Sequence, residues 1–193
     1  MAESRKARES RPPRTLTAAS LENAALFYLS RFASSSGNLR RVLMRKVGRT
    51  ERLGGDTDGA VPLIDGIIAR FLASGLLNDR AYASQAAASL ARRGSSRYSI
   101  AGKLAQKGVD AELVAEAVAT LDAGGETELA AACALVRRRR LGPYRAAGKR
   151  ADWRQKDLAS LARAGFGLDL ARRVLRAPDV AALERLARGD DLD

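Results

Sequence analysis

The stretch "KLAQKGVDAELVAEAVATL", residues 103–121, has a pattern that occurs again elsewhere in the chain. Residues 160–177 read "SLARAGFGLDLARRVLRA", so that a helical leucine, a glycine turn and a second apolar stripe fall at matching places. The segment "VLMRKVGR", residues 42–49, occupies the same position in an earlier copy. A pattern that returns at a nearly constant interval is typical of helical repeat proteins. It predicts three copies of one three-helix unit.

The composition favours helices over strands along the whole chain. Apolar residues make up 46% of the sequence and aromatic residues only 5%, and Ala, Leu, Arg, Glu and Lys dominate. These residues are good helix formers, and the sequence lacks the alternating runs that indicate half-buried strands. We therefore expect an all-α fold, an elongated tandem array of three-helix repeats that resemble helix-turn-helix units. Because each copy is small, we expect neighbouring repeats to share their cores.

Breaks between the helical patterns divide the chain into five segments. In order, we expect a disordered basic arm, three three-helix repeats, and a C-terminal helix with an acidic tail, at residues 1–16, 17–74, 75–125, 126–178 and 179–193. The first repeat contains a Gly/Asp-rich linker at residues 50–61, a composition that breaks helices. In the third repeat, "KDLASLARAG" predicts a short helix that starts near Lys156.

The stretch "SGLLNDRAYAS", residues 74–84, places a polar trio between two apolar patterns. Gly75 can end one helix, and Asn78 or Asp79 can accept hydrogen bonds from the free N–H groups that begin the next. A lone carboxylate with no histidine, cysteine or second acid at a usable spacing is a poor catalytic residue. We interpret the trio as a junction between repeats.

Several classes of catalytic and metal site lack their residues in this sequence. It contains no histidine, the usual general base and the commonest metal ligand. The single cysteine, Cys133, lies in the apolar pattern "ELAAACALV" and is expected to be a buried thiol. The Gly/Asp-rich linker lacks the Lys-Ser/Thr of a phosphate loop and the final Glu of a calcium loop. We expect no catalytic residue, no metal and no cofactor.

The charge distribution suggests a polyanionic partner. The formal net charge is +12, and residues 1–53 hold 12 Lys/Arg against 4 Asp/Glu, whereas residues 54–125 hold 7 against 8. Residues 126–193 hold 15 against 10. Two basic ends around a neutral middle favour contact with nucleic acid. No apolar run approaches the ~20 residues of a membrane span, and no secretion signal is evident, so we expect a cytoplasmic protein.

Basic clusters supply the candidate contact residues. The middle repeat contributes Arg92, Arg93, Arg97, Lys103 and Lys107. The segment "ALVRRRRLGPYR" contributes Arg137, Arg138, Arg139, Arg140 and Arg145. Secondary candidates are Arg40, Arg41, Arg45, Lys46 and, for stacking on bases, Tyr98. Cations in the last turn of a helix are favourable without any ligand, so the arginine run can also be a solvated cap. Tyr144 and Trp153 can stack on bases, and Trp153 can instead pack in the core.

One part of the chain resembles the RecX family of bacterial recombination regulators. "FLASGLLNDRAYA", followed by "LARRGSSRYSIAGKLAQKGVDAELVAEAVATL", has the glycine, leucine, aspartate and aromatic residues of the family's first segment, then its basic-Gly step, short helix and Lys-Gly-Val turn. The matching residues are Gly75, Leu77, Asp79, Tyr82, Ala83, Arg93, Gly94, Ile100, Leu104, Lys107, Gly108 and Val109. The first repeat departs from the family pattern, which often has a histidine there.

The resemblance implies an all-α modulator that binds the filament of the RecA recombinase on single-stranded DNA. It implies inhibition or modulation of ATP hydrolysis, strand exchange and co-protease activity in recombination and SOS repair, without catalytic residues of its own. The implied partners are the RecA filament and single-stranded DNA, with no membrane and no small-molecule substrate.

Two other functions stay open at this point. The basic repeats could form a stand-alone DNA- or RNA-binding module that uses helix-turn-helix-like units. The chain could also be a hydrolase or nuclease with a carboxylate-bound metal, against which stand the missing histidine and the scattered acids.

Overall fold

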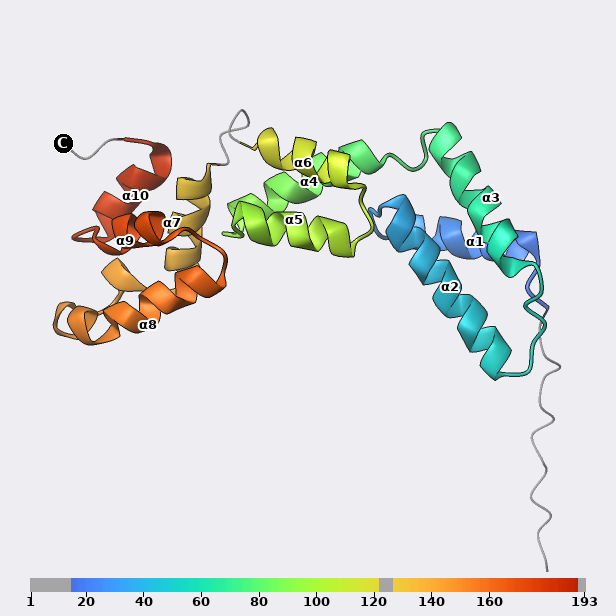
Figure 1. The fold of residues 1–193 in the computed structure, drawn as a ribbon, viewed down its shortest axis with the longest axis horizontal. Helices are drawn as coiled ribbons and strands as arrows, with labels where there is room; N and C mark the ends of the chain where they lie inside the picture. Colours follow the sequence, from blue (N-terminus) through green and yellow to red (C-terminus); the bar gives the residue numbers. More distant parts are fainter. Residues whose placement is uncertain (1–14, 122–126, 191–193) are drawn as a thin grey trace, which may run out of the picture. The chain divides into compact units, whose positions relative to one another are not determined.

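The computed structural model describes residues 15–121 and 127–190. These residues form ten α-helices and two short 3-10 helices, without a strand (Figure 1). The predicted all-α fold of helical repeats is therefore confirmed. The chain divides into two compact units, Met1–Leu77 and Asn78–Asp193. The first unit is one repeat, and the second contains the other two.

The first unit is a three-helix repeat. Its helices are α1 (Ala18–Leu29), α2 (Ser36–Arg52) and α3 (Ala60–Ala73). Thr17 and Ser20 cap α1 reciprocally, because each side chain accepts a hydrogen bond from the backbone N–H of the other. The helices pack α1 on α3, α2 on α3 and α1 on α2 around Leu21, Leu39 and Ile64, which are fully buried.

Two predicted boundaries in this unit were wrong. The connection between α2 and α3 is shorter than the predicted linker at 50–61, because helical hydrogen bonding continues to Arg52 and resumes at Ala60. The predicted arm at 1–16 extends too far, since the side chain of Leu16 is buried in the core and its N–H donates to the Asp56 carbonyl (3.1 Å). Residues 1–14 of the predicted arm lie outside the described residues.

The middle repeat begins the second unit. Its helices are α4 (Asp79–Arg92), α5 (Arg97–Gln106) and α6 (Ala111–Ala119). Asn78 caps α4, as its side-chain oxygen accepts from the N–H of Ala81 at 2.9 Å, so the polar trio acts as a junction. Gly75, which precedes it, has a φ of +75°, a conformation that glycine adopts without a side-chain clash. Residues 122–125, the predicted end of this repeat, lie outside the described residues.

The third repeat contains one helix more than predicted. Its elements are α7 (Glu128–Arg139), η1 (Gly142–Tyr144), η2 (Ala147–Lys149), α8 (Arg150–Arg163), α9 (Leu168–Leu175) and α10 (Val180–Arg188). Helix α10 packs on α7 and buries Ala182, Leu183 and Leu186 in the core of this repeat. The segment 179–193 is therefore part of the third repeat up to Asp190, and residues 191–193 lie outside the described residues.

The buried side chains form three clusters, one in each repeat. The expectation that neighbouring repeats share cores is therefore wrong. In the middle repeat, Ala83, Ala87 and Ala91 of α4 let the helices approach closely enough to enclose Ile100 and Leu104. The third repeat encloses its own core because α10 covers a side of α7 that three helices would leave open.

Candidate interaction site

A groove between α4 and α5 of the middle repeat brings together three of the predicted contact residues. It has a volume of about 320 Å³ and contains Arg93 at the end of α4 together with Lys103 and Lys107 from α5. The remaining lining residues are Tyr82, Ala86, Ser89, Leu90, Leu104 and Gln106. The groove thus combines three exposed cations with an apolar lining.

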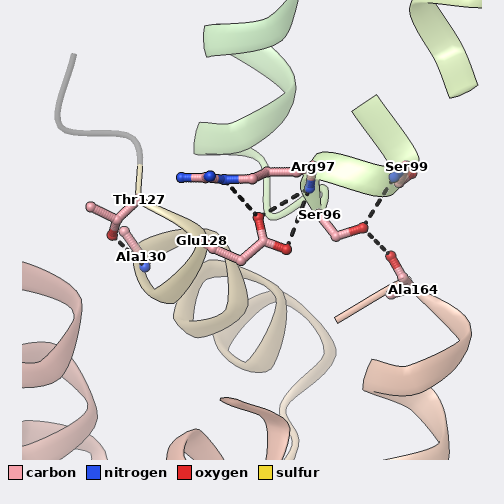
Figure 2. Close-up of polar contacts among 7 residues, drawn as sticks. All are labelled: Ser96, Arg97, Ser99, Thr127, Glu128, Ala130 and Ala164. Atoms are coloured by element: carbon pink, nitrogen blue, oxygen red, sulfur yellow. Dashed lines mark hydrogen bonds and ion pairs between the residues drawn. The ribbon is translucent and has the colours of Figure 1, made fainter. Parts of the chain in front are cut away.

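Ser95 and Ser96 fix the start of α5 beside this groove. The ammonium of Lys103 donates to the Ser95 hydroxyl at 2.9 Å, and Ser95 is buried. Ser96 caps α5 by accepting from the N–H of Ser99 at 3.1 Å, and its own hydroxyl donates to the Ala164 carbonyl at 2.6 Å (Figure 2). One serine therefore begins α5 and also ties it to the end of α8 in the third repeat.

A second contact between the two repeats involves Arg97 and Glu128. The carboxylate of Glu128, in the first turn of α7, accepts from the backbone N–H of Arg97 at 3.0 Å, and it lies 3.7 Å from the Arg97 Nε (Figure 2). A negative charge at the start of α5 is favourable because the free N–H groups there carry partial positive charge. Arg97, a predicted contact residue, thus has an internal partner.

A close backbone approach completes the junction between the middle and third repeats. Gly94 has a φ of +81°, and a Cβ added to it would lie 2.6 Å from the backbone nitrogen of Leu135. The side chain of Arg138 donates to the carbonyl of Arg93 next to it. The glycine lets α7 lie directly against the end of α4, and this contact also explains one arginine of the predicted run.

The other arginines of the run point to different surroundings, as expected for consecutive helical residues. Arg139 donates to the Ser160 hydroxyl at 2.8 Å. Arg140 ends α7 in a left-handed conformation with a φ of 53°. Arg137 lines a small hollow of about 70 Å³ with Glu184 of α10. The structure therefore separates Arg137–Arg140 and does not collect them on one contact face.

Arg145 forms an ion pair with the buried Asp157. Its guanidinium donates to Asp157 at 2.7 and 2.6 Å, and Asp157 also accepts from the N–H of Gly142 at 2.9 Å. The hydrogen bonds to Asp157 raise the pKa of Arg145 above its ordinary value. The Arg145 guanidinium carbon lies 4.3 Å from the ring centre of Trp153, and the Lys156 Nζ lies 4.5 Å from it. Trp153 is 38% exposed, so it is a stacking surface for cations and is not a core residue.

The sequence interpretation missed Asp157 and the role of Arg150. Asp157 is only 2% exposed and lies one helical turn before the buried Leu161. A carboxylate at an apolar position of the helical pattern could therefore have predicted a buried acid in the sequence. Helix α8 begins at Arg150, six residues before the predicted start, which places Arg154 on the helix instead of in a loop. The Arg150 side chain donates to the carbonyls of Arg145, Pro143 and Pro178 and holds the loop before α8 in place.

The secondary candidates lie on α2 and α5. Arg40 forms an ion pair with Asp65 at 2.7 Å, and this hydrogen bond lowers the pKa of Asp65. Lys46 donates to the Ser20 carbonyl at 3.2 Å. Arg41 and Arg45 are exposed on α2. Tyr98 in the first turn of α5 is 82% exposed, so its ring is accessible for stacking.

Comparisons with known proteins identify the family. A family model described as "RecX, second three-helix domain" matches residues 78–118. The protein "Regulatory protein RecX" of Myxococcus xanthus is 44% identical over 174 residues, which cover 89% of this chain and 92% of that protein. The chain belongs to the RecX family. A second "Regulatory protein RecX", from Agrobacterium fabrum, is 31% identical over 79% of this chain and 80% of its own length.

The crystal structure of RecX from Lactobacillus salivarius has the same fold, with a TM-score of 0.58 at 19% identity, covering 83% of this chain and 96% of that one. In this RecX-family chain the matched domain at 78–118 comprises α4, α5 and most of α6, so it contains the whole cationic groove. RecX proteins are named as regulators, and the resemblance found in the sequence is confirmed.

Three further properties of this RecX-family protein concern its cysteine, its potential metal ligands and its helices. Burial raises the pKa of the Cys133 thiol to about 11, so it stays protonated at neutral pH. Among residues 15–121 and 127–190, no three His, Cys, Asp or Glu side chains gather in a way that could hold a metal ion. Over the same ranges, no helix combines the length and the apolar composition of a membrane span.

Proposed function

We propose that this RecX-family chain regulates the RecA recombinase by binding its filament on single-stranded DNA. Binding inhibits or modulates the recombinase's ATPase, strand-exchange and co-protease activities in bacterial recombination and SOS repair, and the regulator itself catalyses no reaction. The observation that carries this proposal is the 44% identity to a regulatory protein RecX over nearly the full length of both chains. The regulator acts in the cytoplasm, and it needs neither a membrane nor a small-molecule substrate.

The cationic groove supports this proposal because it is an exposed surface that the fold leaves open. Arg93, Lys103 and Lys107 are our first candidates for pairing with acidic side chains of the filament. The exposed Arg92, Arg137 and Arg140 are candidates for neutralising DNA phosphates.

The other predicted contact residues support the site indirectly. Arg97, Arg138, Arg139 and Arg145 each hold an internal partner, so their first contribution is to hold α5, α7 and the loop before α8 in position. We retain them as contact candidates because a long side chain with an internal hydrogen bond can still present further donors.

Binding measurements separate this function from that of a stand-alone nucleic-acid-binding module. The protein, labelled at its N-terminus, is titrated with single-stranded DNA alone and with RecA filaments assembled on the same DNA, at several salt concentrations. We expect clearly tighter binding to the filament. Equal affinity for naked DNA, falling steeply with salt, would instead favour the stand-alone module.

A further inference from the structure

The groove between α4 and α5 combines an apolar lining with cations, and this combination indicates which kind of molecule can bind there. Its apolar lining comes from Ala86, Leu90 and Leu104, and its cations are Arg93, Lys103 and Lys107. The residues that line it include no carboxylate. A complementary occupant therefore has an apolar group to cover the lining and negative charges to meet the cations.

A DNA backbone fits this combination poorly. Phosphates pair with cations, but a sugar-phosphate chain offers no aliphatic side chain to replace water on the apolar lining. An acidic peptide offers both, since an aliphatic or aromatic side chain can enter the groove while neighbouring carboxylates reach its cationic rim. Buried apolar anchors supply most of the binding energy at protein interfaces. The lining thus favours a protein partner over the sugar-phosphate backbone of a nucleic acid.

The volume of the groove and the fixed position of its Lys103 ammonium both suit a short peptide segment as the ligand. A volume of about 320 Å³ lies at the lower end of the range for ligand pockets, roughly 300–1,000 Å³, and suits one anchoring side chain with its flanking backbone. The hydrogen bond to the buried Ser95 holds the Lys103 ammonium in place and leaves its other N–H groups available. A cation held in advance loses less side-chain freedom on binding.

We infer that the α4–α5 groove docks a short acidic segment of the recombinase, with one apolar side chain inserted between flanking carboxylates. The inference rests on the proposed function, and it assigns this surface to protein contact instead of DNA contact. The carboxylates pair with Lys103, Lys107 and Arg93, while the apolar side chain covers Ala86 and Leu90.

Two variants and a matched control test the inference through affinity for assembled RecA–DNA filaments. Lys103→Glu/Lys107→Glu reverses two charges of the groove, and we expect a loss of at least about tenfold in filament affinity. Ala86→Trp fills the groove without changing charge and should cause a similar loss. Arg163→Glu/Arg185→Glu makes the same change in net charge on exposed residues of α8 and α10 and should alter affinity by less than about threefold. Far-ultraviolet circular dichroism confirms folding of each variant.

The results of these binding measurements show whether the inference or the proposed function is wrong. If unmodified protein binds filaments but both groove variants bind equally well, the inference fails and the proposed function stands. Equal losses in the groove variant and the charge control would also overturn it, because general attraction would then explain the effect. If the unmodified protein does not bind filaments, the proposed function itself fails.

A photo-crosslinking amino acid at Ala86 identifies the occupant directly. With RecA filaments on single-stranded DNA, we expect a crosslink to a recombinase peptide that has an apolar residue beside aspartates or glutamates. Crosslinks to DNA, to a basic peptide, or to a second copy of this chain would overturn the inference. So would the absence of a crosslink under conditions where the filament is bound.

Discussion

Replacing Gly94 by alanine should destabilise the second unit by about 2–5 kcal/mol. The φ of +81° is a left-handed conformation that costs an L-residue roughly 1–2 kcal/mol. The new Cβ would also lie 2.6 Å from the nitrogen of Leu135, 2.9 Å from its Cα and 3.0 Å from the carbonyl oxygen of Ala131. All three are backbone atoms of α7, so relief requires the helices to separate, and such overpacking costs about 1–3 kcal/mol.

The fluorescence of the single tryptophan can measure this loss of stability in the second unit. Trp153 lies on α8, so its fluorescence during urea unfolding reports on the third repeat. Gly189→Ala is the matched control, because Gly189 has a φ of +82° but open space around its Cβ position. We expect the control to lose only the conformational cost of about 1–2 kcal/mol. Equal losses for the two variants would refute the close approach of α7 to Gly94.

Three further predictions concern single residues. Asp157→Ala should cost about 2–4 kcal/mol and shift the emission of Trp153, because Arg145 and the Gly142 N–H lose their acceptor; an unchanged unfolding midpoint would contradict this role. Gly102→Ala should stabilise the protein by about 0.5–1 kcal/mol, since its Cβ would meet open space on α5; a thermal melt showing lower stability would argue against that helix. Because burial raises the pKa of Cys133 from 9.0 to about 11, its contribution to stability is fully present below pH 9 and is lost as pH rises to 11. Thiol labelling at pH 8 should therefore be slow until urea is added, and fast labelling of the folded protein would refute the burial.

The repeat could be predicted from sequence because its signals are local. The turn glycines Gly108 and Gly165 adopt positive φ values at equivalent places, and each follows a helix, α5 or α8, whose leucine, Leu104 or Leu161, is fully buried. The junction at Asn78 was predictable for the same reason, since a side-chain cap needs only its neighbours in the chain.

The boundaries that failed depend on contacts between distant residues. Leu16 looks like the end of a polar arm, but it is ordered by a core and a hydrogen bond to Asp56, forty residues away in sequence. Helix α10 has an amphipathic pattern of its own, and only its packing on α7 makes it part of the third repeat. Periodicity records that a face is apolar and does not say which partner covers it.

The candidate site, like the fold, could be predicted from the sequence only in part. Sequence charge identified the basic residues but could not show which of them line one groove and which form ion pairs with carboxylates from other elements. Arg97 and Arg145 carry the same charge as Arg93, yet their acceptors, Glu128 and Asp157, come from other elements of the fold. Only the tertiary structure shows which cations the protein uses to hold itself together.

The proposed regulation of RecA can be measured as a change in the rate of RecA ATP hydrolysis on single-stranded DNA. The protein is titrated into preassembled filaments at substoichiometric amounts, beside the Lys103→Glu/Lys107→Glu variant. We predict that the unmodified protein lowers the hydrolysis rate in proportion to the amount bound and that the variant requires at least about tenfold more. An unchanged hydrolysis rate even at saturating protein would contradict the proposed function.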